Sequence, residues 1–320
     1  MQRKTQSIFS DSCKFRHSPS VSTKFKFKIE ETVRKNRLDD FLCDEITAVS
    51  KMYLRNLLKK EICTVNGTIK SGGYHLQKDD LVELEVDVSI ETAMTPEDIP
   101  LEIIFEDEEI IVVNKPAGLL IHPTSAQKTG TLLNALAFYL NRETVNQNNS
   151  NKLIRPGLVH RLDRLTSGLV ITAKTVRAHK VLSNHFERRL VKKKYLAVVE
   201  GNLKNDSGTI DASIGRVEGL THWNVTSDGK PALTHYKMLE KFSDKTLLEL
   251  EPVTGRTNQL RIHCAHLGHP IIGDAAYNGR EFSRLCLHAQ QLGFFHPANN
   301  VWMELQSETP AEMKNNYSGA

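Results

Sequence analysis

An aspartate between cationic side chains is the strongest chemical signal in this 320-residue chain. Residues 160–169 read HRLDRLTSGL, which places Asp163 between Arg161 and Arg164. Nearby positive charge favours the ionised form of a carboxyl group, and an ionised carboxylate serves better as a nucleophile or base than as an acid. The same pattern is also typical of a structural ion pair, so further segments must decide between the two interpretations.

Two later segments carry side chains that fit a site around Asp163. Residues 194–201 read KYLAVVEG and predict a strand that carries Tyr195 at its start, where an aromatic ring can stack on a base. Residues 255–263 read GRTNQLRIH and predict a turn followed by a helix. Asn258 and Arg261 are spaced i, i+3 on the polar face of that helix, so Arg261 is expected to reach Asp163.

The elements that must position these side chains follow from the surrounding pattern. The apolar run 169–174 predicts a buried strand that begins after a tight turn at Gly168. Another strand is predicted over 110–113, followed by a turn at 114–118 and a helix around 132–140. The Asn-rich residues 141–152 predict a mobile loop.

The N-terminal part predicts a separate small module. Apolar spacing favours one helix over 37–46 and a second that Ser50 caps, and Val65-Asn66-Gly67 signals a tight turn. Alternation over 81–87 indicates a half-buried strand, and the proline-containing residues 92–100 are typical of a linker. A domain boundary is therefore expected near residue 95.

Composition bounds the class of protein. The chain is 39% hydrophobic and 25% charged, which is typical of a globular protein of more than one domain. Its 5 cysteines lie far apart and contain no Cys-x-x-Cys pair, which favours a reducing compartment. No apolar stretch is long enough to span a bilayer, and the first 23 residues lack the apolar centre of a secretory signal. We expect a cytoplasmic protein; the basic, serine-rich start is read as a disordered tail, with an organellar transit peptide as the alternative.

Charge is distributed unevenly along the chain. The net charge is only +4, yet residues 151–195 hold twelve Lys or Arg residues and two acids. Residues 91–112 hold eight acids and no Lys or Arg. A polyanion would be attracted to one part of the molecule and repelled from another, so the asymmetry indicates a nucleic acid as partner.

Four segments in the same order resemble the RluA-type pseudouridine synthases: KPAGLLIHP at 115–123, HRLDRLTSGL at 160–169, KYLAVVEG at 194–201 and GRTNQLRIH at 255–263. The resemblance covers about residues 100–305. Residues 37–86 resemble the α-L RNA-binding motif of ribosomal proteins and RNA-modifying enzymes. The chain departs from the synthase pattern at Asn258, where the family usually has His.

The resemblance implies an α+β fold with a mixed, largely antiparallel central sheet and flanking helices. It implies an RNA-binding module over 24–95 and a catalytic domain over 96–310, between tails at 1–23 and 311–320. The implied activity converts uridine in ribosomal or transfer RNA to pseudouridine without a metal or other cofactor. By carry-over, Asp163 is catalytic, Arg161 fills the space left by the flipped nucleotide, Tyr195 stacks on its uracil, and Arg261 pairs with Asp163. We expect a monomer whose partner is RNA.

Four other functions are alternatives to a pseudouridine synthase. The His-rich residues 263–269 would fit a metal hydrolase, but the sequence contains no His-Glu-x-x-His motif. A serine hydrolase would need a Gly-x-Ser-x-Gly turn, which this sequence lacks. A nucleoside hydrolase would use an aspartate at the same sugar carbon and release uracil. A non-catalytic RNA-binding factor would have no need of Asp163, Tyr195 and Arg261 together.

Overall fold

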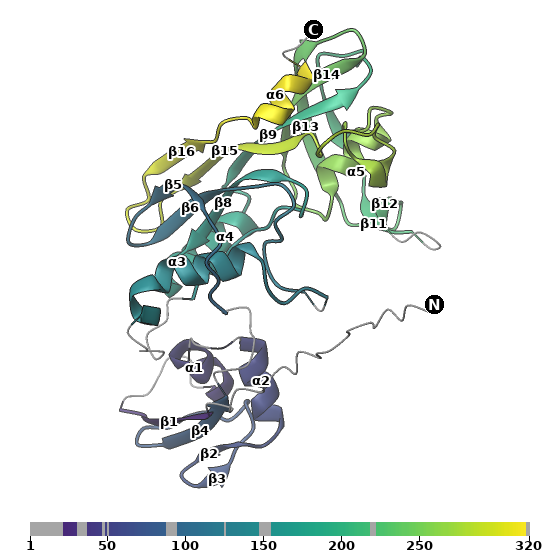
Figure 1. The fold of residues 1–320 in the computed structure, drawn as a ribbon. Coiled ribbons are helices and arrows are strands. Elements are labelled where there is room, and N and C mark those ends of the chain that lie inside the picture. Colours follow the sequence, from purple (N-terminus) through teal and green to yellow (C-terminus); the bar gives the residue numbers. More distant parts are fainter. Residues whose placement is uncertain are drawn as a thin grey trace, which may run out of the picture. The chain divides into compact units, whose positions relative to one another are not determined.

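The computed structural model describes residues 22–30, 37–46, 49, 51–87, 95–124, 126–146, 155–217 and 222–317. Its contacts divide the chain into two compact units, residues 1–92 and 93–320 (Figure 1). Residues 1–21 of the tail predicted over 1–23, the Ser50 cap and part of the predicted linker lie outside the described residues.

The first unit is a small sheet covered by two short helices. The helices are α1 (Leu38–Glu45) and α2 (Lys51–Lys59), and the strands are β1 (Ser22–Lys28), β2 (Cys63–Val65), β3 (Thr68–Ile69) and β4 (Leu81–Asp87), in the order β1-β4-β2-β3. Asn66 and Gly67, with φ of 53° and 75°, form the predicted tight turn between β2 and β3. β1 was not predicted and begins inside the expected tail, although its residues alternate between Lys and Phe.

The second unit is built on one ten-stranded sheet. Its strands are β5 (Glu102–Glu106), β6 (Ile110–Lys115), β7 (Gly157–Leu158), β8 (Ser167–Ala173), β9 (Lys192–Glu200), β10 (Ser207–Asp211), β13 (Leu233–Lys241), β14 (Lys245–Pro252), β15 (Leu287–Phe295) and β16 (Trp302–Gln306). The main path runs β10-β13-β14-β9-β15-β8-β6-β5, with β16 on β15 and β7 on β8. Of these described strand pairs only β8–β15 is parallel. The mixed, mostly antiparallel sheet confirms the predicted α+β class.

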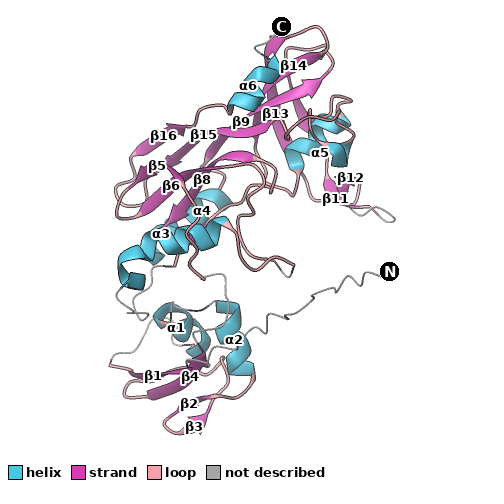
Figure 2. Ribbon diagram, in the orientation of Figure 1, coloured by secondary structure: helices cyan, strands magenta, loops and turns pink. Residues whose placement is uncertain are grey.

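Helices flank this sheet, and a separate hairpin lies beside it (Figure 2). The helices are α3 (Leu132–Asn146), α4 (Val176–Glu187), α5 (Gln259–His266) and α6 (Ala311–Tyr317), with a 3-10 turn η2 (Ala275–Tyr277); the hairpin is β11 (Ile214–Arg216) and β12 (Trp223–Val225). Two predictions are wrong here. Residues 141–146 continue α3 instead of starting a loop, and the expected tail from 311 forms α6, because Met313 is fully buried in the core.

Strand β8 occupies the middle of the sheet and is buried along its whole length. Leu169 and Ile171 pack in the cluster that includes α4, whereas Val170 packs in the cluster that includes α3. Burial on both faces explains why Leu169, Val170 and Ile171 form an unbroken apolar run. Gly168 has φ of +116°, and a Cβ there would lie 2.3 Å from the Ala289 carbonyl oxygen, so the parallel contact with β15 requires glycine.

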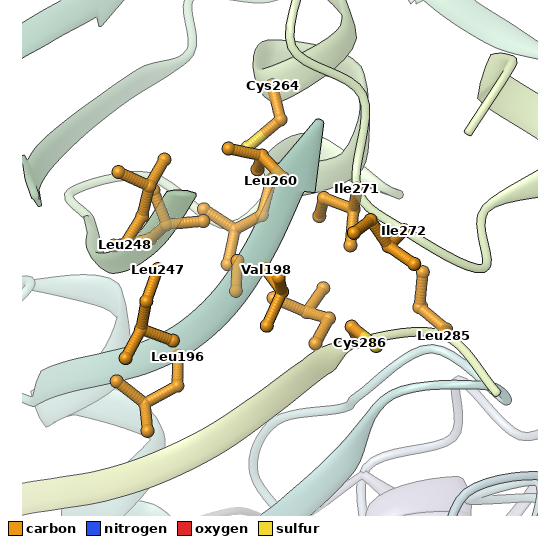
Figure 3. Packing of buried hydrophobic residues seen from close by; sticks show 14 of the residues in the cluster. Leu196, Val198, Leu247, Leu248, Leu260, Cys264, Ile271, Ile272, Leu285 and Cys286 are labelled. Carbon is orange, nitrogen blue, oxygen red and sulfur yellow. The ribbon is translucent and has the colours of Figure 1, made fainter. Parts of the chain in front are cut away.

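A third cluster anchors α5 to the other half of the sheet. Leu260 and Cys264 of α5 lie beside Val198 of β9 and Leu248 of β14 (Figure 3). The same cluster takes in residues of β15 and α6. The helix that carries Arg261 is therefore fixed to β9, the strand that carries Tyr195. Among the described residues, no helix has the length and apolar character needed to traverse a membrane.

Candidate active site

The loop before β8 holds Asp163 in a fixed turn. The Asp163 carbonyl accepts a hydrogen bond from the Thr166 amide at 3.2 Å. Lys115, at the end of β6, is almost fully buried, and its Nζ donates to the carbonyls of Pro116, Leu119 and Arg164 at 2.9, 2.9 and 3.1 Å. Burial lowers the Lys115 pKa to about 7, against the attraction of Asp163. One buried side chain thus joins the turn at 116–119 to the Asp163 loop.

Asp163, Arg161 and Tyr195 line one cavity of about 440 Å³. Arg189, Lys193 and Arg256 also line it, so cationic groups outnumber the two acids, Asp163 and Glu187. The predicted concentration of positive charge therefore surrounds a cavity with a carboxylate in its wall. A cavity of this kind suits an anionic ligand that presents a reacting group to Asp163.

Arg261 lies outside the cavity lining, and its guanidinium is held by a different acid. Its Nε and Nη2 donate to Oδ2 and Oδ1 of Asp274 at 2.8 and 2.6 Å, and the side chains of Arg261 and Asp274 are 8% and 0% exposed. The predicted direct pairing of Arg261 with Asp163 is therefore wrong for this structure. Arg261 acts on Asp163 through its charge alone.

The balance at Asp163 also differs from the expectation. Burial raises the pKa of Asp163 above its ordinary value, and this outweighs the opposing effects of Arg261, Arg161, the Asn258 amide hydrogen bond and Lys115. The sequence shows the arginines but not how much water the fold excludes, so it overstated their effect. A carboxylate with a raised pKa is a stronger base once it has lost its proton.

Tyr195 is the fourth residue of β9, not the first, and lies opposite Leu250 of β14 and Ala289 of β15. Its ring packs against the clusters of both halves of the sheet. Burial, and then the charge of Asp163, raises the pKa of the Tyr195 hydroxyl, so the phenol stays neutral at physiological pH. A rigid neutral ring in the cavity wall is suited to stacking.

His160 is a cavity residue to which the sequence pattern assigned no role. Its ring stacks on Phe186 with the centroids 4.7 Å apart, and its Nε2 accepts a hydrogen bond from the Ile171 amide at 3.0 Å. Burial lowers its pKa to about 3, so the ring is neutral and its proton is on Nδ1. Its position in the HRLD segment was the only available signal.

The other sequence candidates have structural partners. His263 bonds to Thr234 Oγ1 and to the Ala212 carbonyl at 2.9 and 3.0 Å, as expected for a packed histidine. No cluster of three metal-binding side chains occurs in the part of the chain that the structure describes. Ser167 bonds to His288 at 2.8 Å, but both are buried, and the second ring nitrogen of His288 meets Ser307, not a carboxylate.

Comparisons with known proteins agree on one kind of enzyme. A family model described as RNA pseudouridylate synthase matches residues 109–266. An uncharacterized RNA pseudouridine synthase of Bacillus subtilis is 38% identical over 88% of this chain and 93% of its own length. The ribosomal large subunit pseudouridine synthase D of Escherichia coli K12 is 34% identical over 90% of this chain and 93% of its own length.

A solved structure is similar as well. The human RNA pseudouridylate synthase domain containing 1 superposes with a TM-score of 0.55 at 29% identity, over 67% of this chain and 85% of the human one.

Proposed function

Because this chain belongs to the RluA-type family of RNA pseudouridine synthases, we propose that it acts on ribosomal RNA with Asp163 as its catalytic residue. The observation that carries the role of Asp163 is that it shares one cavity with Arg161 and Tyr195. Support for ribosomal RNA comes from the relative named as a large-subunit enzyme, with transfer RNA as the second candidate.

The reaction is an isomerisation that balances without a cofactor. The bond between ribose C1′ and uracil N1 breaks, the uracil turns in place, and a bond forms between C1′ and C5. C5 loses a proton and N1 gains one, so no atoms or electrons are added overall. We propose that the Asp163 carboxylate drives the first step by attacking the nucleotide or by removing a ribose proton, since both need a positioned, deprotonated carboxylate.

The remaining cavity side chains serve to extrude and hold the nucleotide. Taking a base out of an RNA stack costs on the order of a few kcal/mol. We assign Arg161 to the space that the nucleotide leaves and Tyr195 to the face of the extruded uracil, because both line the cavity with Asp163. Arg261 does not line the cavity, and we assign it the role of favouring the negative charge on Asp163 through its own positive charge.

The first unit is proposed to supply RNA affinity. Lys59 and Lys60 are exposed at the end of α2 and directly after it, where they are available to phosphates. Replacing Lys59 and Lys60 with alanine is expected to weaken binding and to flatten its dependence on salt, without changing the rate on saturating RNA. Filter binding at several salt concentrations, with single-turnover rates, checks this; an unchanged salt slope would remove the unit from the interface.

A direct test of function uses RNA from a source strain that lacks the gene. Wild-type protein and Asp163→Ala are incubated with ribosomal and transfer RNA, and pseudouridine is mapped by mass spectrometry. We expect modification of ribosomal RNA by the wild type, binding without modification by the variant, and no free uracil from either. Binding by both with modification by neither would favour an RNA-binding factor, and release of uracil would favour a glycosidase.

We also propose that the enzyme works as a monomer in the cytoplasm. The cysteines at 43, 63, 264 and 286 are buried thiols in the described part of the chain, which is consistent with a reducing compartment. Size-exclusion chromatography with light scattering and fractionation of source cells test the two statements. A stable dimer would contradict the first statement, and accumulation in an organelle would contradict the second.

A further inference from the structure

Asn258 precedes α5 with backbone angles that few residues adopt. Its φ and ψ are 54° and 21°, in the left-handed region, where asparagine is among the better tolerated non-glycine residues. Its neighbours Thr257 and Gln259 line the cavity that holds Asp163, and the Asn258 backbone amide is one of the groups that oppose the rise in the Asp163 pKa. Its side chain makes no capping hydrogen bond to the helix. The amide group is therefore available for another task.

The Asn258 amide joins two buried side chains. Its Oδ1 accepts a hydrogen bond from Arg261 Nη1 at 3.1 Å, and its Nδ2 donates to the Tyr277 hydroxyl at 3.1 Å. The Tyr277 hydroxyl donates in turn to the Trp223 carbonyl at 3.1 Å. Every proton in this chain of bonds has a fixed direction, because Asn258 Nδ2 can only donate and the Trp223 carbonyl can only accept.

Tyr277 is also the ring on which the Arg261 guanidinium lies. The guanidinium carbon is 5.0 Å from the ring centroid, and Tyr277 is only 5% exposed. Asp274 then fixes the other side of the guanidinium by its two hydrogen bonds. Arg261 is thus held by an acid, an amide and an aromatic face, and cannot easily turn toward Asp163.

Trp223 begins strand β12, so the chain of bonds ends on the β11–β12 hairpin. This hairpin is not part of the large sheet. Its connection to the α5 side of the active site runs through the Tyr277 hydroxyl and the contacts of Trp223 and Val225 with Ile262 and Tyr277 in one apolar cluster.

We propose that Asn258 and Tyr277 are positioning residues that hold the Asp163 carboxylate in its reactive place and link it to the β11–β12 hairpin. The proposal rests on the catalytic role of Asp163. Where the RluA-type family usually has His, this chain has Asn258, which tolerates the left-handed backbone and bonds to both Arg261 and Tyr277. Loss of either link is expected to let the 258 amide move away from the carboxylate.

Two variants test the proposal without removing bulk from the core. Tyr277→Phe deletes the hydroxyl and keeps the ring under Arg261. Asn258→Gly keeps the backbone N–H and the left-handed backbone conformation but removes the side-chain amide. Single-turnover rates on saturating RNA are expected to fall on the order of tenfold in both, as for a displaced reacting group, with RNA affinity within about twofold of wild type.

The pH profile separates positioning from a general structural defect. If the Asn258 backbone amide moves away, Asp163 loses a group that favours its charged form, so the acid limb of the rate profile should move to higher pH. The deficit of each variant should therefore shrink as pH rises. Tyr139→Phe is the matched control. It also removes a tyrosine hydroxyl from a hydrogen bond, because Tyr139 of α3 donates to Glu106 at 2.9 Å. The rate and pH profile of this variant should match those of the wild type.

Each outcome decides a different statement. If Asp163→Ala is inactive while Tyr277→Phe and Asn258→Gly keep the wild-type rate and profile, the positioning proposal is wrong and the catalytic role of Asp163 stands. Equal losses at every pH also overturn it. If Asp163→Ala is active, the catalytic role proposed for Asp163 fails, and the positioning proposal that rests on it fails as well.

Discussion

The two carboxylates whose charges act on Arg261, Asp163 and Asp274, have opposite surroundings. Asp274 is 0% exposed, and both of its oxygens accept hydrogen bonds from the guanidinium. Asp163 lines the cavity, and the charges of Arg261 and Arg161 and the Asn258 amide act on it without a direct ion pair. A saturated buried carboxylate stabilises a fold, whereas a buried carboxylate with unused acceptors is ready to react. The four predictions below test this contrast between Asp163 and Asp274.

Asp163→Asn should have the largest effect on activity. The amide keeps the size of the side chain but cannot act as a nucleophile or base, so the single-turnover rate should fall on the order of 10⁴-fold or more. RNA affinity should stay near that of the wild type. Activity above about one hundredth of wild type, once deamidation of the introduced side chain back to aspartate has been excluded by peptide mass, would contradict the assignment.

Asp274→Asn should have the largest effect on stability. It leaves a buried guanidinium without its counter-charge, which costs about 3–5 kcal/mol. Denaturant unfolding followed by circular dichroism measures the loss. Asp244→Asn is the control, because its ion pair with Arg280 at 2.6 Å is exposed and its removal should change stability little. Similar losses in the two variants would break the contrast between closed and open sites.

Tyr195 should matter through its ring more than through its hydroxyl. Tyr195→Leu removes a stacking surface worth about 1–3 kcal/mol per base, and the rate on RNA should fall accordingly. Tyr195→Phe keeps the ring and should cost less than about 1 kcal/mol. Rates for both variants, normalised to folded protein, test the order. A larger loss in Tyr195→Phe would assign the chemistry to the hydroxyl instead.

The smallest expected effect is the pH dependence of stability. The Asp163 pKa is raised on folding, so the folded state holds this proton more tightly than the unfolded chain. The contribution of Asp163 to stability is then most favourable below its unfolded pKa and is lost as pH rises through the folded value. Asp163→Asn should therefore become more stable relative to wild type as pH rises through that window. A difference that does not change with pH would show that burial does not perturb Asp163.

The sequence was sufficient for the parts of the fold that obey local patterns. The apolar run of β8, the Asn66-Gly67 turn and the grouping of Asp163, Arg161 and Tyr195 could be predicted because periodicity and motif order carry them. The partner of Arg261 could not. The guanidinium pairs with Asp274, which follows α5, and only the path of the chain after that helix decides this.

Short elements stabilised by distant contacts were also missed. α6 has only seven residues, and it is ordered by burying Met313 against β9, more than a hundred residues earlier in the chain. The Tyr277 link has no local signal either, because its partners lie at 258, 223 and 261. Such contacts follow from the assembled sheet and not from the neighbouring sequence.

The parallel contact between β8 and β15 has a consequence for biosynthesis. Ser167, four residues after Asp163, bonds to His288, which is 121 residues further along the chain. A ribosome making this protein exposes the Asp163 loop long before it exposes the strand that closes the sheet behind it. Because such distant pairings form slowly, the nascent chain carries the Asp163 carboxylate without a finished cavity at least while the 121 residues from Ser167 to His288 are being made. The protein can therefore modify RNA only after β15 has been made and paired with β8.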